Sequence, residues 1–248
     1  MTNQSEQTLT IVAVADTKIK MTIDSLKKSQ IGLNYEKVLL ITSKEIKRSL
    51  YFPNLEVINI EPIRSFKEYN NFIIYELYKY IKTTHLLLVQ WDGFVLESKK
   101  WKDEFYLYDY IGAPFIPRVM NKSYSRDKHG KFYSVGNGGF SFRSFKLLEA
   151  PTKYNLRDDF EFTSCHEDGF FCILHRNYLE SKGFKWATFE IAKEFAIESP
   201  LSFEFLYNVP FGFHGKRILK LLFLINLIKI FSKLTLKINQ KIKFKLFK

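Results

Sequence analysis

Four short apolar runs within the first 90 residues constrain the fold of this chain more than any other feature. They cover residues 9–15, 38–42, 57–60 and 85–90. Apolar runs of this length, without alternating polar residues, are typical of strands buried on both faces of a parallel sheet. The residues that follow each run matter most for function, because ligands of such sheets bind beyond the carboxyl ends of the strands.

Segments with helical spacing separate and follow these runs. We expect helices at 18–30, at about 69–82, at 99–108, at 144–149 and from 165 towards 178. Strands that alternate with helices predict an α/β fold with right-handed crossovers. The basic loop at 118–131 is a candidate mobile element that could close over a bound phosphate, or an ordinary solvated loop.

Composition excludes several classes of protein. Of the 248 residues, 46% are hydrophobic and 17% aromatic, which is incompatible with a disordered chain. Two cysteines cannot form a disulfide framework, and no Cys-x-x-Cys pair suggests zinc. The first seven residues lack the features of a signal peptide, so we expect a cytoplasmic setting.

The positive charge is concentrated in one segment. The net charge is +12, and residues 216–248 carry ten lysines and arginines and no acidic residue, which leaves only +2 on residues 1–215. Lysines interrupt the apolar residues of this tail before 18 positions, so it is too polar to span a bilayer. We interpret 216–248 as a basic amphipathic helix on an anionic membrane surface. A helix packed on the body is the alternative, and confinement of the charge to an apolar tail disfavours nucleic acid.

Asp92 directly follows the fourth apolar run, after Gln90 and Trp91. A carboxylate at this edge of a sheet could hold a divalent cation, which prefers oxygen ligands. Because Gly93 comes next, Asp92 could instead be an ordinary turn residue.

Two adjacent carboxylates, Glu167 and Asp168, follow His166 at the start of an expected helix. One of them could be a general base for an acceptor hydroxyl. Both could equally serve only to favour the helix dipole.

Glycines mark two further candidate sites. Gly136, Gly138 and Gly139 would allow positive φ angles and a close approach to a phosphate or sugar, or simply a tight turn. His214 lies between Gly212 and Gly215 and could complete a metal site suited to Mn²⁺, or be an exposed loop residue.

Taken in order, these segments resemble a known family. The motifs are QWDGFV at 90–95, YDYIGAP at 108–114, GNGGFSFRS at 136–144, Glu-Asp at 167–168 and PFGFH at 210–214. Together they resemble bacterial and viral glycosyltransferases long described as a domain of unknown function, over residues 8–215 but not the tail. That family is similar to GT-A glycosyltransferases. The resemblance implies a Rossmann-type mixed sheet flanked by helices, forming a domain over 1–215, with the tail 216–248 as a membrane-associating appendage.

The resemblance also implies roles for individual residues. Asp92 matches the last acid of an Asp-x-Asp motif whose first acid is replaced by Gln90, and with His214 it would hold Mn²⁺ or Mg²⁺. Asp168 matches the catalytic base of inverting members, preceded by Glu167. The implied donor-binding residues are Val14, Ala15, Asp16, Gln90, Trp91, Asp92, Gly138 and Gly139.

The implied reaction moves a sugar from a nucleotide-sugar donor to a glycan or lipid-linked acceptor, such as a lipopolysaccharide or capsule precursor. Asp168 would deprotonate the acceptor and attack would invert the anomeric centre, although a retaining outcome stays open if Asp168 only orients the acceptor. The expected location is the cytoplasmic face of the membrane, with no nucleic-acid partner. Alternatives are a nucleotidyl- or phosphosugar transferase and a non-enzymatic basic module that binds membrane or nucleic acid.

Overall fold

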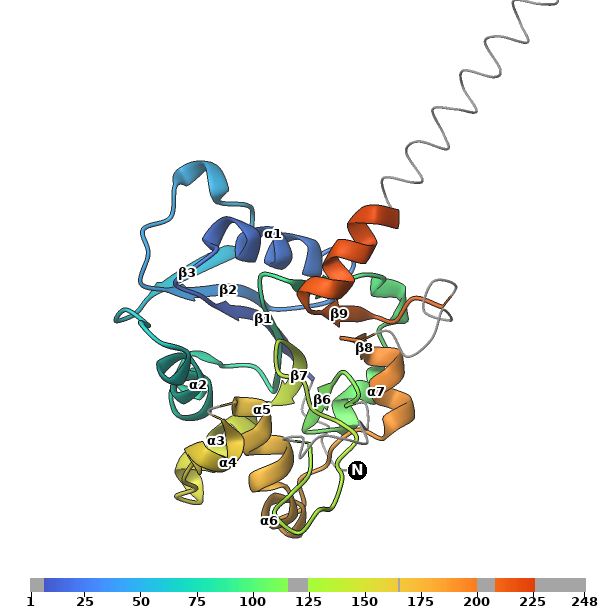
Figure 1. The fold of residues 1–248 in the computed structure, drawn as a ribbon. Coiled ribbons are helices and arrows are strands. Elements are labelled where there is room, and N and C mark those ends of the chain that lie inside the picture. The colour runs from blue at the N-terminus through green and yellow to red at the C-terminus, as the bar shows by residue number, and fades with distance from the viewer. Residues whose placement is uncertain (1–6, 116–124, 165, 200–207, 226–248) are drawn as a thin grey trace, which may run out of the picture.

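A six-stranded mixed sheet forms the centre of the computed structural model, which describes residues 7–115, 125–164, 166–199 and 208–225. The strand order is β3-β2-β1-β4-β7-β6 (Figure 1). The four parallel strands are β1 (Leu9–Val14), β2 (Lys37–Thr42), β3 (Leu55–Asn59) and β4 (His85–Val89). β7 (Phe140–Ser144) runs antiparallel to β4, and β6 (Tyr110–Gly112) runs antiparallel to β7.

A small second sheet lies beyond the carboxyl end of β4. It has the order β5-β9-β8 and consists of β5 (Gly93–Val95), β9 (Gly212–His214) and β8 (Ala196–Ile197). β5 pairs antiparallel with β9, so that Gly93 lies opposite His214. This pairing brings a late part of the chain next to the residues that follow β4.

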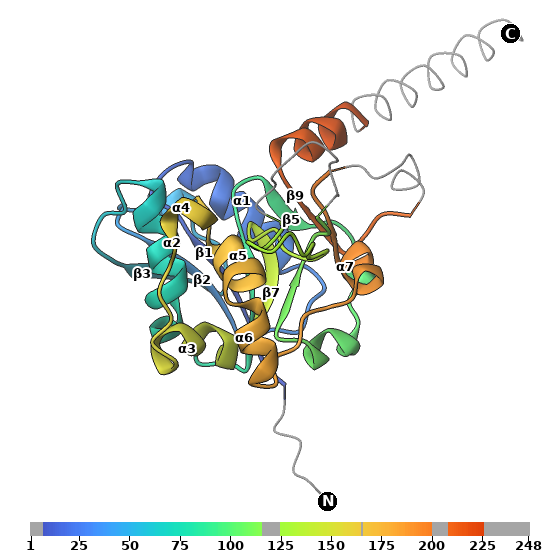
Figure 2. The same ribbon diagram turned by 60° about the horizontal axis from the view of Figure 1, so that its bottom comes forward.

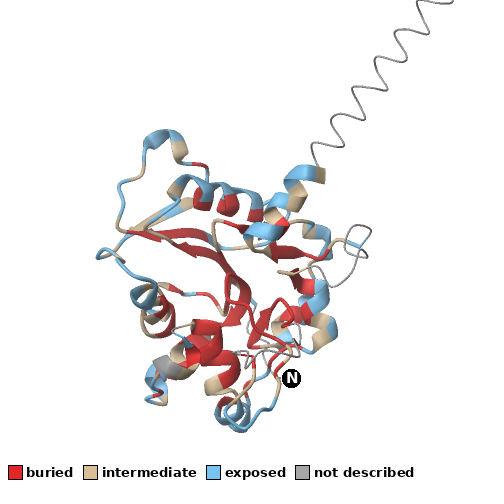
Figure 3. Ribbon diagram, in the orientation of Figure 1, coloured by how far each residue is buried: buried red, intermediate tan, exposed pale blue. Residues whose placement is uncertain are grey.

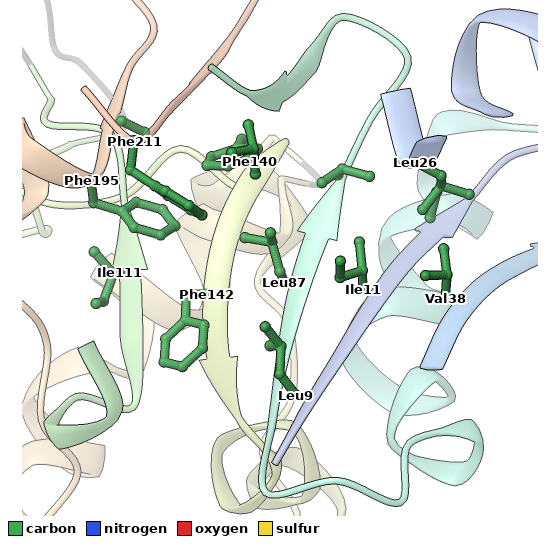
Figure 4. Packing of buried hydrophobic residues seen from close by; sticks show 14 of the residues in the cluster. Leu9, Ile11, Leu26, Val38, Leu87, Ile111, Phe140, Phe142, Phe195 and Phe211 are labelled. Carbon is green, nitrogen blue, oxygen red and sulfur yellow. The ribbon is translucent and has the colours of Figure 1, made fainter. Parts of the chain in front are cut away.

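Helices cover both faces of the central sheet because its strands are apolar on both sides. On one face, Leu9 and Ile11 of β1 pack in the same cluster as Leu26 of α1 (Ile19–Ser29) (Figure 4). On the other face, Val12 packs with residues of α2 (Phe66–Tyr75) and α3 (Phe145–Lys153). Buried residues therefore run along the whole centre of the molecule, as Figure 3 shows. This confirms the predicted mixed sheet flanked by helices.

The second half of the chain contributes shorter helices. They are α4 (Phe160–Thr163), α5 (Glu167–Gly169), a π-helical segment (Phe170–Leu174), α6 (Arg176–Ser181) and α7 (Phe189–Phe195). α2 contacts both α3 and α5, and Figure 2 shows this helical layer from its outer side. The described residues also contain 3₁₀ turns at Arg48–Leu50, Leu77–Tyr80, Ser98–Lys100 and Asp103–Leu107.

The predicted strands and the first helix are confirmed, whereas the four other expected helices differ from expectation. α2 begins earlier than 69 because Ser65 accepts a hydrogen bond from the Glu68 amide, which starts the helix at Phe66. It ends at Tyr75, before a separate 3₁₀ turn. α3 continues to Lys153, beyond the expected end at 149.

The helix predicted at 99–108 is wrong. Trp101 has an extended backbone between two 3₁₀ turns, and its ring packs edge-on against Phe105, Phe142 and Phe211. The packing of the indole against these three rings therefore outweighs the helical tendency of the local sequence. The single helix expected from 165 to 178 is also wrong, because the π-helical segment divides it.

Residues 216–225 are helical. Ile218 is buried in a cluster with Ile197 and Phe213 of the small sheet, while Phe223 and Leu224 are exposed. No helix within the described residues is long and apolar enough to cross a membrane. The rest of the predicted membrane-binding tail, 226–248, lies outside the described residues, as does the 116–124 part of the basic loop.

Candidate functional site

The carboxyl end of β4 and the neighbouring β9 place three polar side chains together. Gln90 and Asp92 follow β4, and His214 ends β9. His214 Nε2 lies 3.2 Å from Gln90 Oε1 and 3.5 Å from Asp92 Oδ1. The structure therefore joins residues that the sequence separates by about half of the chain.

Acceptor atoms surround the imidazole of His214 on both sides. Its Nδ1 lies 3.0 Å from Glu198 Oε1, and its Nε2 faces the two oxygens of Gln90 and Asp92. Burial alone would lower the pKa of His214, but hydrogen bonding with the Asp92 and Glu198 carboxylates raises it to about 10. The surroundings of Nε2 thus favour a positive charge, which is supplied by either a proton or a cation.

The donor atoms at this position fit a divalent cation. Asp92 is buried, and its Oδ1 lies 3.5 Å from His214 Nε2. The Tyr69 hydroxyl accepts a hydrogen bond of 2.9 Å from Gln90 Nε2, which directs the amide oxygen of Gln90 towards His214. An imidazole nitrogen with carboxylate and amide oxygens suits Mn²⁺. No cluster of three or more His, Cys, Asp or Glu side chains with metal-binding geometry occurs in the described part of the chain.

Two consecutive glycines connect this group to the Glu167-Asp168 pair. A Cβ atom on Gly139 would overlap the His214 imidazole, and one on Gly138 would overlap the Glu167 carboxylate. Close approach is therefore what requires glycine here. The expected positive φ is found instead at Asn137, at 61°, whose side-chain amide donates to the Ala113 carbonyl.

Asp168 and Glu167 are both buried, but their surroundings differ. Asp168 Oδ2 accepts a hydrogen bond of 3.3 Å from the Gly138 amide, and its Oδ1 accepts one from the Gly169 amide. Burial and the neighbouring Glu167 carboxylate raise the pKa of Asp168 to about 6. Glu167 instead forms an ion pair of 2.8 Å with Arg143, a residue that is completely buried in β7. Asp168 is thus the carboxylate of this pair whose pKa lies closest to neutrality.

A family model described as "Protein of unknown function (DUF5672)" matches residues 53–214. The chain belongs to the DUF5672 family. The matched range contains Gln90, Asp92, the glycine pair, Glu167-Asp168 and His214, whereas β1 and residues 216–248 lie outside it.

Among solved structures, two of the galactosyltransferase LgtC are similar to this DUF5672 chain. One is LgtC in complex with donor and acceptor sugar analogues, at 12% identity and a TM-score of 0.47, covering 84% of this chain and 87% of that chain. The other is an active-site mutant of LgtC, at 12% identity and a TM-score of 0.48 over the same shares of the two chains. No curated protein matches the chain.

The predicted donor residues Val14, Ala15 and Asp16 of the DUF5672 chain lie at the carboxyl end of β1 or just beyond it. Val14 is buried in the sheet, and the Ala15 amide donates to the Ile41 carbonyl. The Asp16 carboxylate accepts four hydrogen bonds, from the backbone amides of Ser43 and Ile63 and from the hydroxyls of Thr42 and Ser43. Partial burial would raise the pKa of Asp16, but these bonds outweigh it and lower the pKa. Asp16 therefore connects the end of β1 with the end of β2 and with the segment that follows β3.

Trp91, the remaining predicted donor residue, lies between two lysines. Lys18 Nζ is 3.3 Å from the centre of the indole ring and Lys216 Nζ is 5.5 Å from it. Lys18 has a left-handed backbone with φ of 53°, an uncommon conformation for a residue other than glycine. Both ammonium groups therefore lie beside the turn that carries Asp92.

Sequence reasoning missed three residues of this DUF5672 site: Tyr69, Arg143 and Glu198. Arg143 left a signal, because it is a charged residue inside the short, fully buried strand β7. Glu198 and Tyr69 left none, since only tertiary folding brings them to His214 and Gln90. In the described part of the basic loop, Arg126 donates a hydrogen bond to the Gly130 carbonyl and Lys131 donates one to Asn177.

Proposed function

We propose that the chain is a glycosyltransferase that moves a sugar from a nucleotide-sugar donor to a glycan or lipid-linked acceptor. The observation that carries this proposal is the contact of Gly138 with the Glu167-Asp168 pair and of Gly139 with His214. A candidate base and a candidate cation site are thereby held on either side of one short glycine segment. The order of the sequence motifs, which resembles that of GT-A enzymes, supports the same function.

Asp168 is the proposed general base. With a pKa near 6, the carboxylate is mostly ionised at neutral pH and remains basic enough to accept the proton of an acceptor hydroxyl. The acceptor oxygen then forms a bond to the anomeric carbon while the bond from that carbon to the diphosphate oxygen breaks. Attack from the face opposite the diphosphate inverts the anomeric centre.

Asp92, His214 and Gln90 are the proposed ligands of Mn²⁺ or Mg²⁺. When bound, the cation would offset the negative charge that develops on the diphosphate leaving group. Val14, Ala15 and Asp16 would border the nucleotide base, and Trp91 with its two lysines would lie beside the donor.

We further propose that the tail attaches the enzyme to the inner face of the membrane, where a lipid-linked acceptor for lipopolysaccharide or capsule would be reached. The ten basic residues and the absence of acids in 216–248 complement an anionic leaflet. The exposed side chains of Phe223 and Leu224 supply apolar contacts at the start of this segment. Co-sedimentation with vesicles of anionic phospholipid should be lost on deletion of 226–248, and retention of binding would contradict this part of the proposal.

The test of the enzymatic proposal is a panel of nucleotide sugars measured with Mn²⁺, Mg²⁺ or EDTA. A ligand that binds the folded state raises the melting temperature, so the donor is expected to stabilise the protein in the presence of metal. Asp168→Asn should abolish release of the nucleoside diphosphate and preserve this stabilisation. Release of pyrophosphate or a nucleoside monophosphate would instead indicate a nucleotidyl- or phosphosugar transferase. No response from a folded protein would favour a non-enzymatic binding module.

A further inference from the structure

Arg143 is a fully buried cation next to the candidate base, and the proposed reaction assigns it no role. It lies in β7 with a relative exposure of 0%. Its Nη2 is 2.8 Å from Glu167 Oε2, and its Nε donates a hydrogen bond of 3.0 Å to Ser141 Oγ. The guanidinium also packs against the rings of Tyr110 and Phe171, at 5.0 and 5.6 Å from their centres.

Stability alone does not account for this residue. Removing a guanidinium and a carboxylate from water costs free energy that their attraction often fails to recover, so a well-packed apolar pair is commonly at least as stable. The Nη1 group of Arg143 moreover finds no hydrogen-bond acceptor among the described residues. A costly buried ion pair at this position is therefore better explained by what it holds in place.

Arg143 holds the backbone of Gly138 in place. The Gly138 carbonyl accepts hydrogen bonds from Ser141 Oγ at 2.9 Å and from Arg143 Nη2 at 3.4 Å. The amide of the same glycine donates to Asp168 Oδ2. Arg143 is therefore connected to Asp168 indirectly, through Gly138 and through Glu167, which precedes Asp168 in the chain.

We infer that Arg143 is a positioning residue, which acts through Gly138 and Glu167 to hold the Asp168 carboxylate in place and in its ionised form. The inference rests on the proposed function, in which Asp168 is the base.

The charges around Asp168 give this inference a measurable consequence. The carboxylates of Glu167 and Glu198 raise the pKa of Asp168, whereas His166 lowers it. Tyr110 on β6 and Cys172 on the π-helical segment also lie close enough to Asp168 to interact with its charge. Arg143 offsets the charge of Glu167. Loss of Arg143 should therefore leave the negative charge of Glu167 uncompensated, which raises the pKa of Asp168 further.

The test is a titration of the full chain with ¹³C-labelled aspartate carboxylates, followed by NMR, in which Asp168→Asn identifies the signal of Asp168. In Arg143→Met we expect the midpoint of Asp168 to rise by about one pH unit or more. Adding Glu167→Gln should return the midpoint to the wild-type value or below, which a purely structural role of Arg143 would not produce. Lys37→Met, which breaks an exposed ion pair with Glu56 at the start of β2, should leave it unchanged.

An unchanged midpoint in folded Arg143→Met would overturn the inference. If this variant fails to fold, the comparison passes to Arg143→Lys, which keeps the charge and loses the forked contacts. Its Asp168 midpoint should stay within about half a unit of the wild type, while kcat for hydrolysis of the nucleotide sugar found in the panel falls at least about tenfold with little change in KM. Wild-type kcat in that variant would equally refute a positioning role.

The two proposals fail in different ways. A wild-type protein that turns over no nucleotide sugar rejects the proposed function, whatever the titration shows. An active wild type together with an Arg143→Met variant of unchanged kcat and unchanged Asp168 midpoint rejects only the role of Arg143.

Discussion

The Nδ1 atom of His214 lies 3.0 Å from Glu198 Oε1. Because a carboxylate only accepts hydrogen bonds, this contact makes Nδ1 a donor, so that the lone pair of Nε2 faces Asp92 and Gln90 once a cation replaces the Nε2 proton. Carboxylate–histidine contacts of this kind orient metal-binding histidines and raise their affinity. Glu198 thus connects β8 to the candidate cation site without contributing a ligand of its own.

Replacing Glu198 should weaken cation binding. We expect Glu198→Gln to lower the affinity for Mn²⁺ by about 10- to 100-fold, because the imidazole loses the carboxylate that fixes its tautomer and orientation. Isothermal titration of the full chain with MnCl₂ measures this. Glu190→Gln changes an exposed acid on α7 and should bind Mn²⁺ as the wild type does. Equal affinities in all three proteins would show that Glu198 has no such role.

The glycine pair should not tolerate even one additional carbon. Gly139→Ala is expected to displace His214 and to reduce Mn²⁺ binding, and Gly138→Ala should displace Glu167. Each change should destabilise the protein by about 1–3 kcal/mol, the usual cost of overpacking, as measured by urea denaturation. Gly169→Ala is the matched control, because its Cβ would approach no atom closer than 3.4 Å. A Gly139→Ala variant with wild-type stability and Mn²⁺ affinity would contradict the close approach seen here.

The raised pKa of Asp168 predicts a stability that falls with increasing pH. The folded state holds the proton up to about pH 6, whereas the unfolded chain releases it near pH 3.8. The stabilising contribution is therefore present below pH 3.8 and is lost as the pH rises through 6. Asp168→Asn has no titrating carboxyl at this position, so it does not lose this stability as the pH rises. It should be more stable than the wild type by about 2 kcal/mol at neutral pH, and the difference should shrink at about pH 4.5.

Urea denaturation of both proteins across this pH range provides the measurement. Asp159→Asn alters an acid that caps α4 far along the chain from the glycine pair, and serves as a control for a general effect of removing one negative charge. If the difference between wild type and Asp168→Asn stays constant with pH, Asp168 has an ordinary pKa.

The start of α2 supplies a prediction on stability alone. Ser65 Oγ accepts a hydrogen bond from the Glu68 amide, and Glu68 Oε2 accepts one from the Arg64 amide. Ser65→Ala should destabilise the protein by about 1 kcal/mol, the usual effect of losing an N-cap, without changing Mn²⁺ affinity. Thermal unfolding detects the loss, and Ser65→Thr, which keeps a hydroxyl, should restore most of it. No loss in Ser65→Ala would mean that the cap contributes nothing.

The central strands and α1 could be predicted because they are specified locally. The apolar runs that form β1, β2 and β4 are buried on both faces, and nothing distant has to be known to recognise them. The same holds for the position of Asp92, since a residue that follows a buried strand must lie at the sheet edge.

The segments that were predicted wrongly are those whose conformation depends on distant partners. Trp101 interrupts a helical pattern because its ring packs against Phe142 and Phe211, which lie far along the chain. The contacts of Glu198 and Tyr69 with the site likewise arise only from the arrangement of β8, β9 and α2. Local spacing carries no information about such contacts, whereas the motif order indicated His214 without revealing its neighbours.

The pairing of β5 with β9 also has a consequence for the synthesis of the protein. The ribosome releases β4 and β5 long before Gly212–His214, so β5 must wait for its partner strand while most of the chain is made. Strand pairing between such distant segments is slow, because the loop must close before any contact compensates the lost entropy. A nascent chain can therefore assemble the β1–β4 core early, yet it gains His214 beside Asp92 only after residues 212–214 have been synthesised. The contact between His214 and Asp92 can therefore form only when the chain of the domain is complete.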